Sequence, residues 1–329
     1  MYCVSFKYFN FLNANLSDLL QLFDVKNGIP NLSILLPIGL SFHTFQAMSY
    51  TIEVYRGNQK SERNFITYSL YVMFYPQLVA GPIERPQNVL HQFKEEHKID
   101  YRNAVDGLKL MAWGLFKKVV IADRLSEMVD FVYNNPTNYK GLPLIISSVF
   151  FSVQIYCDFS GYSDMAIGVA LLLGFKLPTN FRTPYQSASI TEFWRRWHIS
   201  LSTWLKDFLY ISVGGNRQGT FAGFLFPALF FFIAILWSIS FIGTSHLPLF
   251  ISAGASIVFI FTFLFSKDRE RTLFTNVNLL TTMLLGGLWH GASLRFIIWG
   301  ALHGIALAVH KIVLEYFPAK TEKKKTFFS

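Results

Sequence analysis

Along this chain, long apolar segments alternate with short polar ones. From Gln218 to Ser266 there is no Asp, Glu, Lys or Arg. One membrane crossing takes roughly 20 residues, so this stretch predicts an extra pair of transmembrane helices within residues 220–266, namely Phe221 to Ile242 and Leu247 to Phe265. Other apolar runs lie at Leu32 to Ile52, Phe65 to Ala80, Leu142 to Tyr156, Ser163 to Phe175, Val277 to Trp289 and Phe296 to Val313, with a weaker one at Val105 to Ala122.

These runs predict the fold class. An open sheet cannot satisfy its edge hydrogen-bonding groups in lipid, and the sequence lacks the strict alternation of an outer-membrane barrel. We therefore expect an all-α, polytopic membrane bundle with roughly eight to ten spanning or partial helices and additional interfacial helices. We expect residues 1–329 to form a single membrane-embedded domain.

Residues 189–210 follow a different pattern. Apolar residues and His198 fall at helical spacing on one face, and charged residues occupy the remainder. This pattern is typical of a helix that lies in the membrane interface. It directs His198, with Trp194 and Trp197, toward protein or acyl chains and away from the neighbouring arginines.

The composition supports a membrane protein, since 52% of the residues are hydrophobic and only 15% are charged. Charged residues make up about a quarter of an ordinary globular domain. The net charge of +9 is spread over short clusters between apolar runs, which indicates contacts with anionic membrane lipid rather than with nucleic acid. Two cysteines without ligand spacing predict neither a disulfide framework nor a zinc site.

A lone imidazole stands out in the uncharged stretch Leu273 to Leu294, at His290. Ionisable groups within membrane segments are costly and by default indicate function. Imidazole takes up a proton near neutral pH, so His290 is our candidate general base. Gly287 and Gly291 form a small-xxx-small pair that would let another backbone approach beside it.

Polar segments separate several of the apolar runs. Gly81 to Pro86 contains two prolines and a charge pair, and it cannot continue as helix. Residues 158–164, DFSGYSD, lie between two apolar runs, so Asp158 and Asp164 must face water or protein. Either carboxylate could bind a sugar, or one could cap a helix that begins near Ser163.

Five motifs together resemble the membrane-bound O-acyltransferase family, in its bacterial branch around the alginate O-acetyltransferases. They are GPIERP at 81–86, DFSGYSD at 158–164, WRRWHISLS at 194–202, GGNR at 214–217 and GGLWHGA at 286–292. The resemblance covers roughly Leu40 to Ala308. It implies a multi-pass enzyme of the cell inner membrane that moves an acyl group from a cytoplasmic thioester to a hydroxyl of an exported polysaccharide or a secreted partner protein.

The resemblance also implies roles for two histidines, with His290 as the catalytic residue and His198 in support. We expect the acyl donor to be acetyl-coenzyme A or another small acyl thioester, with no cofactor or metal bound. His198 could orient the acceptor, donate a hydrogen bond to the carbonyl oxygen or relay a proton. Among candidate substrate-binding residues, Arg182 and Arg217 could receive donor phosphates; the others are Asp158, Asp164, Trp194, Trp197 and Trp289.

The chain departs from the family pattern at its ends and in the extra helical pair. It begins near the first motif and stops soon after the helix that follows His290, so we expect it to be truncated relative to the family. Alternative functions remain open: D-alanyl transfer to teichoic acid, a proton-coupled transporter with a His and Asp relay, and an inactive scaffold. His303 and His310 invite a metal site with His290, but no carboxylate or cysteine accompanies them at ligand spacing.

Overall fold

The fold is taken from a computed structural model that describes residues 2–21, 24–33, 39–78, 81–98, 100–229 and 268–317. Within these ranges every regular element is helical, which confirms the all-α class. The α-helices are α1 (Tyr2–Gln21), α2 (Leu40–Tyr55), α3 (Phe65–Val72), α4 (Pro86–Val89), α5 (Tyr101–Leu115), α6 (Asp123–Tyr133), α7 (Leu142–Leu172), α8 (Ile190–Arg196), α9 (Ile199–Trp204), α12 (Arg269–His290) and α13 (Leu294–Tyr316). Two π-helices, Phe116–Ala122 and Leu205–Tyr210, and 3-10 turns at Tyr75–Gln77, Gln92–Lys94, Pro136–Asn138 and Pro184–Gln186 complete the set.

The chain divides into two compact units, and each carries part of the candidate chemistry. Unit 1 comprises Met1–Ile34, Ala188–Thr191 and Leu205–Ser329, and unit 2 comprises Leu35–Ser187 and Glu192–Trp204. His290 belongs to unit 1 and His198 to unit 2.

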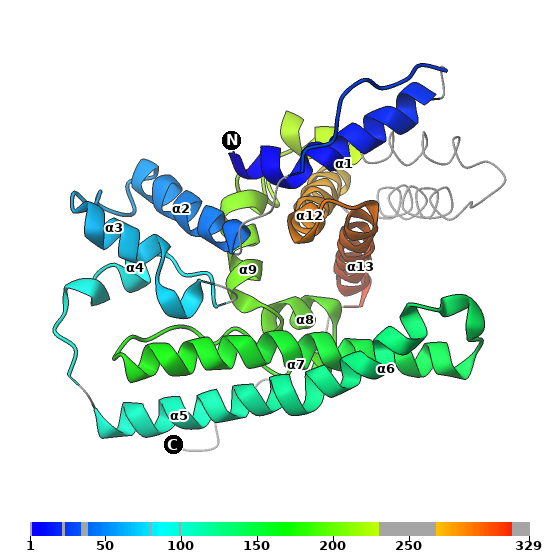
Figure 1. The fold of residues 1–329 in the computed structure, drawn as a ribbon. Helices are drawn as coiled ribbons and strands as arrows, with labels where there is room; N and C mark the ends of the chain where they lie inside the picture. The colour runs from blue at the N-terminus through cyan, green and yellow to red at the C-terminus, as the bar shows by residue number, and fades with distance from the viewer. Residues whose placement is uncertain are drawn as a thin grey trace. The chain divides into compact units, whose positions relative to one another are not determined.

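The long helix α7 and the helical stretch formed by α5, the first π-helix and α6 form the largest packing surface of unit 2 (Figure 1). Glycines bring α5 and α7 into backbone contact. A Cβ on Gly114 would lie 2.5 Å from the Gly161 carbonyl oxygen, and one on Gly168 would lie 2.6 Å from that of Gly107. These pairings make the two helices antiparallel and fix their register.

The α7 helix corrects one sequence prediction, because no helix begins near Ser163. The two apolar runs on either side of residues 158–164 belong to one continuous helix of 31 residues. The charges that suggested a break are compensated by lysines of the π-helix instead: Lys117 pairs with Asp164, and Lys118 with Asp158. With their carboxylates paired, these positions do not have to interrupt the helix.

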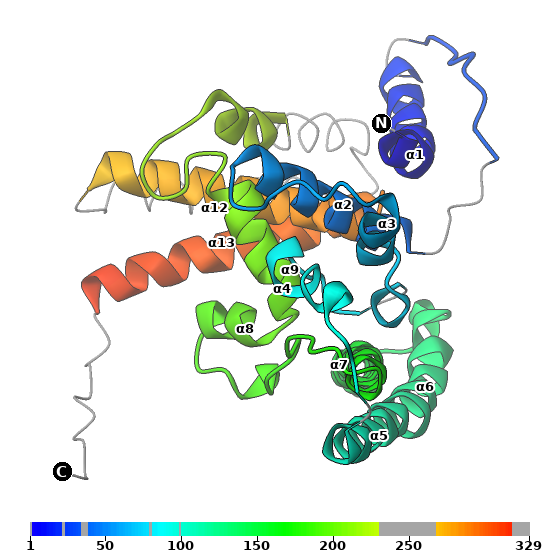
Figure 2. The same ribbon diagram turned by 90° about the vertical axis from the view of Figure 1, so that its left-hand side faces the viewer.

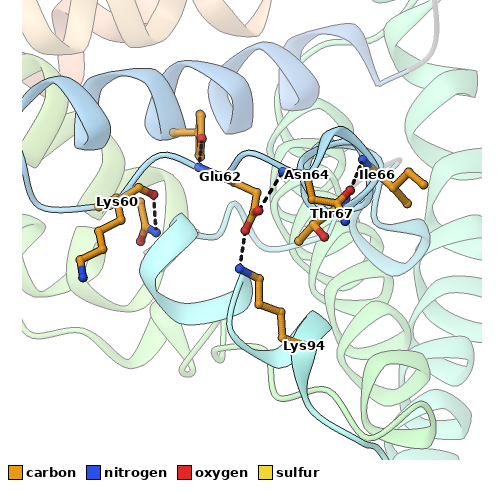
Figure 3. A network of polar contacts seen from close by, with 8 residues as sticks. Lys60, Glu62, Asn64, Ile66, Thr67 and Lys94 are labelled. Carbon is orange, nitrogen blue, oxygen red and sulfur yellow. Dashed lines mark hydrogen bonds and ion pairs between the residues drawn. The ribbon is translucent and has the colours of Figure 1, made fainter.

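Around the start of α3, unit 2 is held by a helix cap and an ion pair (Figure 3). The Asn64 side-chain oxygen accepts from the amides of Ile66 and Thr67 and caps α3. The Glu62 carboxylate accepts from the Asn64 amide at 3.0 Å and pairs with Lys94 at 2.5 Å. Lys94 approaches from the 3-10 turn after α4, so this network ties two short elements together.

In unit 1, α12 and α13 form an antiparallel pair (Figure 2). A Cβ on Gly300 would lie 2.2 Å from the Met283 carbonyl oxygen, and one on Gly304 would lie 3.2 Å from the Leu280 Cα. Asp268 caps the start of α12 by accepting from the Arg271 amide, and Ser293 caps α13 by accepting from the Arg295 amide. The connection between the two helices is three residues long and follows His290 directly.

Two described helices are long and apolar enough to cross a membrane, Leu142–Leu172 and Leu294–Tyr316. The wider expectation of roughly eight to ten helices stays a prediction. The extra pair predicted within residues 220–266 lies largely outside the described residues; of it, residues 221–229 are helical. The apolar run from Phe65 gives a short helix, α3, followed by a 3-10 turn at Pro76.

Candidate functional site

His198 lies between two short helices rather than on one long one, which corrects the prediction of an unbroken amphipathic helix over residues 189–210. α8 ends at Arg196, α9 begins at Ile199, and His198 has a φ of 40°. That left-handed conformation is unfavourable for a residue with a side chain and breaks the helical path. The His198 side chain is 1% exposed, so the turn directs the imidazole into the interior of unit 2.

The described polar partners of His198 include Asn180 and Ser200 of its own turn. The Asn180 side-chain oxygen is 3.2 Å from His198 Nδ1, and it accepts from the Ser200 amide at 3.1 Å and the Ser200 hydroxyl at 2.9 Å. The Asn180 side-chain nitrogen donates to the Ser163 hydroxyl on α7 at 3.0 Å. All four of these side chains are buried. Buried polar groups with satisfied hydrogen bonds specify one arrangement.

Aromatic rings enclose the same imidazole. The Phe159 ring of α7 meets His198 edge to face at 4.6 Å, and the Phe181 ring lies 6.2 Å away. Trp197 stacks on Phe193 at 5.5 Å and meets Phe181 at 5.2 Å. Trp194, half-buried, meets Phe193 at 5.6 Å. Trp194 and Trp197, both predicted to bind substrate, thus belong to one aromatic cluster. Phe181 connects Trp197 of this cluster to His198.

The carboxylates Asp158 and Asp164 are paired with lysines. Asp164 lies 2.5 Å from Lys117 Nζ, which also donates to the Ser160 hydroxyl at 3.0 Å. Asp158 lies 2.7 Å from Lys118 Nζ, and the same ammonium pairs with Asp123. The first pair is the more buried, with side-chain exposures of 9% and 21%. These contacts give both carboxylates a structural role; a role in binding sugar stays a prediction.

The GPIERP segment is held through its backbone. The Ile83 amide donates to the Ser200 hydroxyl at 3.0 Å, and the carbonyls of Pro82 and Glu84 accept from the Gln77 amide group and the Tyr71 hydroxyl. The Glu84 side chain is 6% exposed. Its burial raises its pKa to about 7, against an ordinary value near 4.5. The motif therefore connects to the His198 turn through Ser200.

His290 is the last residue of α12, and Gly291 leaves the helix in an extended conformation. The imidazole is exposed, and its ring contacts are aromatic: Trp289 at 4.9 Å, Trp299 at 5.0 Å and Phe296 at 6.2 Å. A Cβ on Gly287 would lie 2.2 Å from the Phe296 carbonyl oxygen. The predicted close backbone approach at Gly287 is confirmed, while Gly291 faces the Phe296 ring instead.

The amino-terminal helix supplies donors to the last turn of α12. The Tyr8 hydroxyl donates to the Leu288 carbonyl at 2.8 Å, and the Lys7 ammonium donates to the Trp289 carbonyl. Lys7 Nζ also lies 5.7 Å from the centre of the Trp289 ring. Carbonyls at a helix carboxyl end lack partners within the helix and attract positive charge. Lys7 and Tyr8 therefore stabilise the turn that carries His290.

The remaining predicted residues lie on loops or on the α13 helix. Arg182 and Arg217 are exposed, and their backbone amides donate to the carbonyls of Arg196 and Gly214. His303 lies 4.5 Å from Trp299 on α13, and His310 Nδ1 is 2.8 Å from the Thr191 hydroxyl. In unit 1 the Trp289 ring therefore contacts the His290 ring directly. In unit 2 the Trp197 ring is connected to His198 through Phe181.

Sequence reasoning missed Asn180, Ser200 and Lys7. Asn180 lies two residues before the candidate Arg182, and Ser200 lies inside the WRRWHISLS motif. Their closeness in sequence to those candidates was the available signal. Lys7 is 282 residues from its carbonyl partner, and no local pattern marks it.

Comparisons with known proteins agree with these motifs. Residues 58–237 match the model of MBOAT, the membrane-bound O-acyltransferase family. A probable alginate O-acetylase AlgI of Pseudomonas aeruginosa is 40% identical over 93% of this chain and 48% of its own length. A peptidoglycan O-acetyltransferase of Helicobacter pylori is 35% identical over 93% of this chain and 52% of its own length.

A more distant relative, a teichoic acid D-alanyltransferase of Bacillus subtilis, is 24% identical over 83% of this chain and 58% of its own length. The chain spans about half the length of the curated relatives that it matches. The matched family model covers more than half of the chain and includes the His198 turn. On this match, the chain belongs to the membrane-bound O-acyltransferase family.

Proposed function

We propose that this chain carries the acyl-transfer centre of a multi-pass enzyme of the cell inner membrane. The enzyme moves an acetyl group from acetyl-coenzyme A, on the cytoplasmic side, to a hydroxyl of an exported polysaccharide or of a secreted partner protein. Relatives named for O-acetylation of alginate and of peptidoglycan, aligned over 93% of the chain, support the acetyl group and the polysaccharide.

The observation that most supports the proposal is the arrangement at the end of α12. Backbone contact at Gly287 and the two α1 donors fix the turn before His290, while the imidazole itself remains exposed. A residue that exchanges protons with a substrate needs a fixed position together with access.

In the proposed reaction His290 takes the proton of the acceptor hydroxyl as its oxygen attacks the thioester carbonyl carbon. The carbon–sulfur bond then breaks, the sulfur leaves as the coenzyme A thiolate, and the imidazolium returns the proton to that sulfur. The products are the acetyl ester and the free thiol, and His290 is neutral again. General-base assistance of this kind contributes about 10²-fold to 10⁴-fold to the rate.

The test replaces His290 with Ala in the full chain, expressed in its own membrane. We expect the membrane level to stay unchanged and the O-acetyl content of surface polysaccharide, measured by mass spectrometry, to fall by about 10²-fold or more. His91→Ala is the matched control, because His91 is exposed after α4 and the described hydrogen bond of its ring is to the nearby Gln87 carbonyl.

Three other outcomes would contradict the proposal. Full acetylation in His290→Ala would indicate a scaffold. Substrate accumulation that follows the proton gradient and ignores donor supply would indicate a transporter. Loss of D-alanyl esters in place of acetyl esters would favour the function named for the Bacillus subtilis relative.

A further inference from the structure

We propose that Asn180 is a positioning residue that holds His198 as the neutral tautomer with its proton on Nδ1. Its importance for acyl transfer rests on the proposed function and on the supporting role that the family resemblance implies for His198. The tautomer itself follows from hydrogen bonds within unit 2.

The first step is the orientation of the Asn180 amide. A backbone N–H can only donate, and the Ser200 amide lies 3.1 Å from the Asn180 side-chain atom that faces the turn. That atom must therefore be the carbonyl oxygen. The opposite end, the NH₂ group, then lies 3.0 Å from the Ser163 hydroxyl and donates to it. Both ends of the amide agree on one orientation.

The second step is the proton on the imidazole. The oriented Asn180 oxygen is 3.2 Å from His198 Nδ1, and an amide oxygen can only accept. The contact is attractive only when Nδ1 carries hydrogen. The Ser200 hydroxyl, 3.5 Å from Nδ1, does not reverse this assignment, because it donates to the same oxygen at 2.9 Å and accepts from the Ile83 amide at 3.0 Å. Of the two neutral tautomers, this contact selects the one with its lone pair on Nε2.

The third step is the rigidity of the arrangement. The Asn180 backbone carbonyl accepts from the Ile199 amide at 2.9 Å, so Asn180 holds the turn through both its backbone and its side chain. The φ of 40° at His198 is a conformation that persists only where the surroundings impose it. With Phe159 edge-on at 4.6 Å and 1% exposure, the ring has no room to turn over.

This tautomer selects among the roles open to His198. As a neutral ring it accepts at Nε2 and does not donate there, so it does not stabilise a carbonyl oxygen by donation from Nε2. It can accept a hydrogen bond from a hydroxyl or take up a proton in a relay. An orienting partner that fixes a histidine tautomer in this way is a recurrent device in catalytic sites.

The experiment labels the histidine ring nitrogens of the full chain with ¹⁵N and records their NMR signals in lipid bilayers. Subtracting the spectrum of His198→Gln identifies the signals of His198. We expect a protonated Nδ1 and an unprotonated Nε2. Asn180→Leu should abolish this preference and lower polysaccharide acetylation by roughly 10-fold to 100-fold, the usual cost of losing such a partner.

Two further variants separate positioning from a general loss of structure. Asn180→Asp keeps an acceptor oxygen beside Nδ1 and should keep the Nδ1 proton, which Asn180→Leu should not. Ser163→Ala removes the acceptor on the far side of the amide and should also keep the tautomer. If Asn180→Leu fails to accumulate in the membrane, the spectra of the unmodified chain and of Asn180→Asp still show which ring nitrogen of His198 carries the proton.

A proton on Nε2 in the unmodified chain would overturn the inference. So would an Asn180→Leu variant with the Nδ1 proton and full acetylation. Full acetylation in His198→Gln, alongside the expected spectrum, would instead remove His198 from the proposed function and leave the tautomer assignment intact.

Discussion

The α5–α7 pair of unit 2 and the α12–α13 pair of unit 1 are both packed through glycines, yet their ionisable side chains have opposite surroundings. In the first pair, Gly114 and Gly161 contact each other's backbone, and Lys117 nearby is 7% exposed and paired with Asp164. In the second pair, Gly287 contacts the α13 backbone, and His290 three residues later meets aromatic rings and is exposed.

The difference separates a group held by an opposite charge from a group whose described ring contacts are aromatic. Removing a buried ammonium that pairs with a carboxylate and a hydroxyl is costly, because the carboxylate would be left buried without a partner. An imidazole that contacts rings at its faces and edges has no fixed counter-charge of that kind in its described contacts. The glycine contacts set position in both pairs, and the neighbouring side chains decide the chemistry.

Breaking the buried ion pair should have the largest effect. Lys117→Met leaves Asp164 without its cation between α5 and α7, and we expect the free energy of unfolding to fall by about 3–5 kcal/mol. Denaturant unfolding in detergent micelles, followed by tryptophan fluorescence, would measure it. Lys118→Met is the matched control: its side chain is 26% exposed and Asp158 is 42% exposed, so the loss should be about 1 kcal/mol or less. Equal losses in the two variants would contradict the distinction.

Filling the glycine contact beside His290 should have the next largest effect. In Gly287→Ala the new methyl group would lie 2.2 Å from the Phe296 carbonyl oxygen, so α13 must move. We expect a loss of about 2–3 kcal/mol, the upper part of the usual range for overpacking, together with reduced acetylation because the His290 turn shifts. Gly28→Ala, at a position with no atom within 4 Å, is the control. Unchanged acetylation in Gly287→Ala would show that backbone contact does not position His290.

Local patterns predicted the glycine contact at Gly287 but not the charge pairs. A small residue on a helix lets a neighbouring backbone come close, so the sequence alone indicated a close approach at Gly287. The apparent interruption at Asp158 and Asp164 depended on lysines that lie at least 40 residues earlier in the chain. Periodicity over one segment cannot include such partners, and it therefore predicted a break that α7 does not have.

The same limit applies to the two histidines. The spacing of residues 189–210 is helical, yet the chain turns at His198, where a hydrogen bond to the side-chain oxygen of Asn180, 18 residues away, supports a positive φ. The caps on the His290 turn come from Lys7 and Tyr8, which lie 282 and 280 residues from the carbonyls that they bind. The motifs named the histidines, whereas long-range contacts decide how each one is held.

The smallest expected effect concerns a buried carboxyl of unit 2 that is not paired with a lysine in the described contacts. Burial raises the pKa of Glu84 to about 7, and its side-chain contact is the neutral Asn88 amide at 3.3 Å. Between pH 4.5 and about 7 the folded chain therefore holds a proton that the unfolded chain has lost. Stability falls as pH rises through that window, and this carboxyl contributes no slope on either side of it.

Glu84→Gln removes this titration while keeping a similar shape. Relative to the unmodified chain, the variant should gain roughly 2 kcal/mol of unfolding free energy on going from about pH 5 to about pH 7.5, as expected for a shift of this size. Denaturant unfolding at a series of pH values measures the difference between the two chains. A difference that is constant with pH would mean that burial does not raise the pKa of Glu84 and that its carboxyl is ionised in the folded protein.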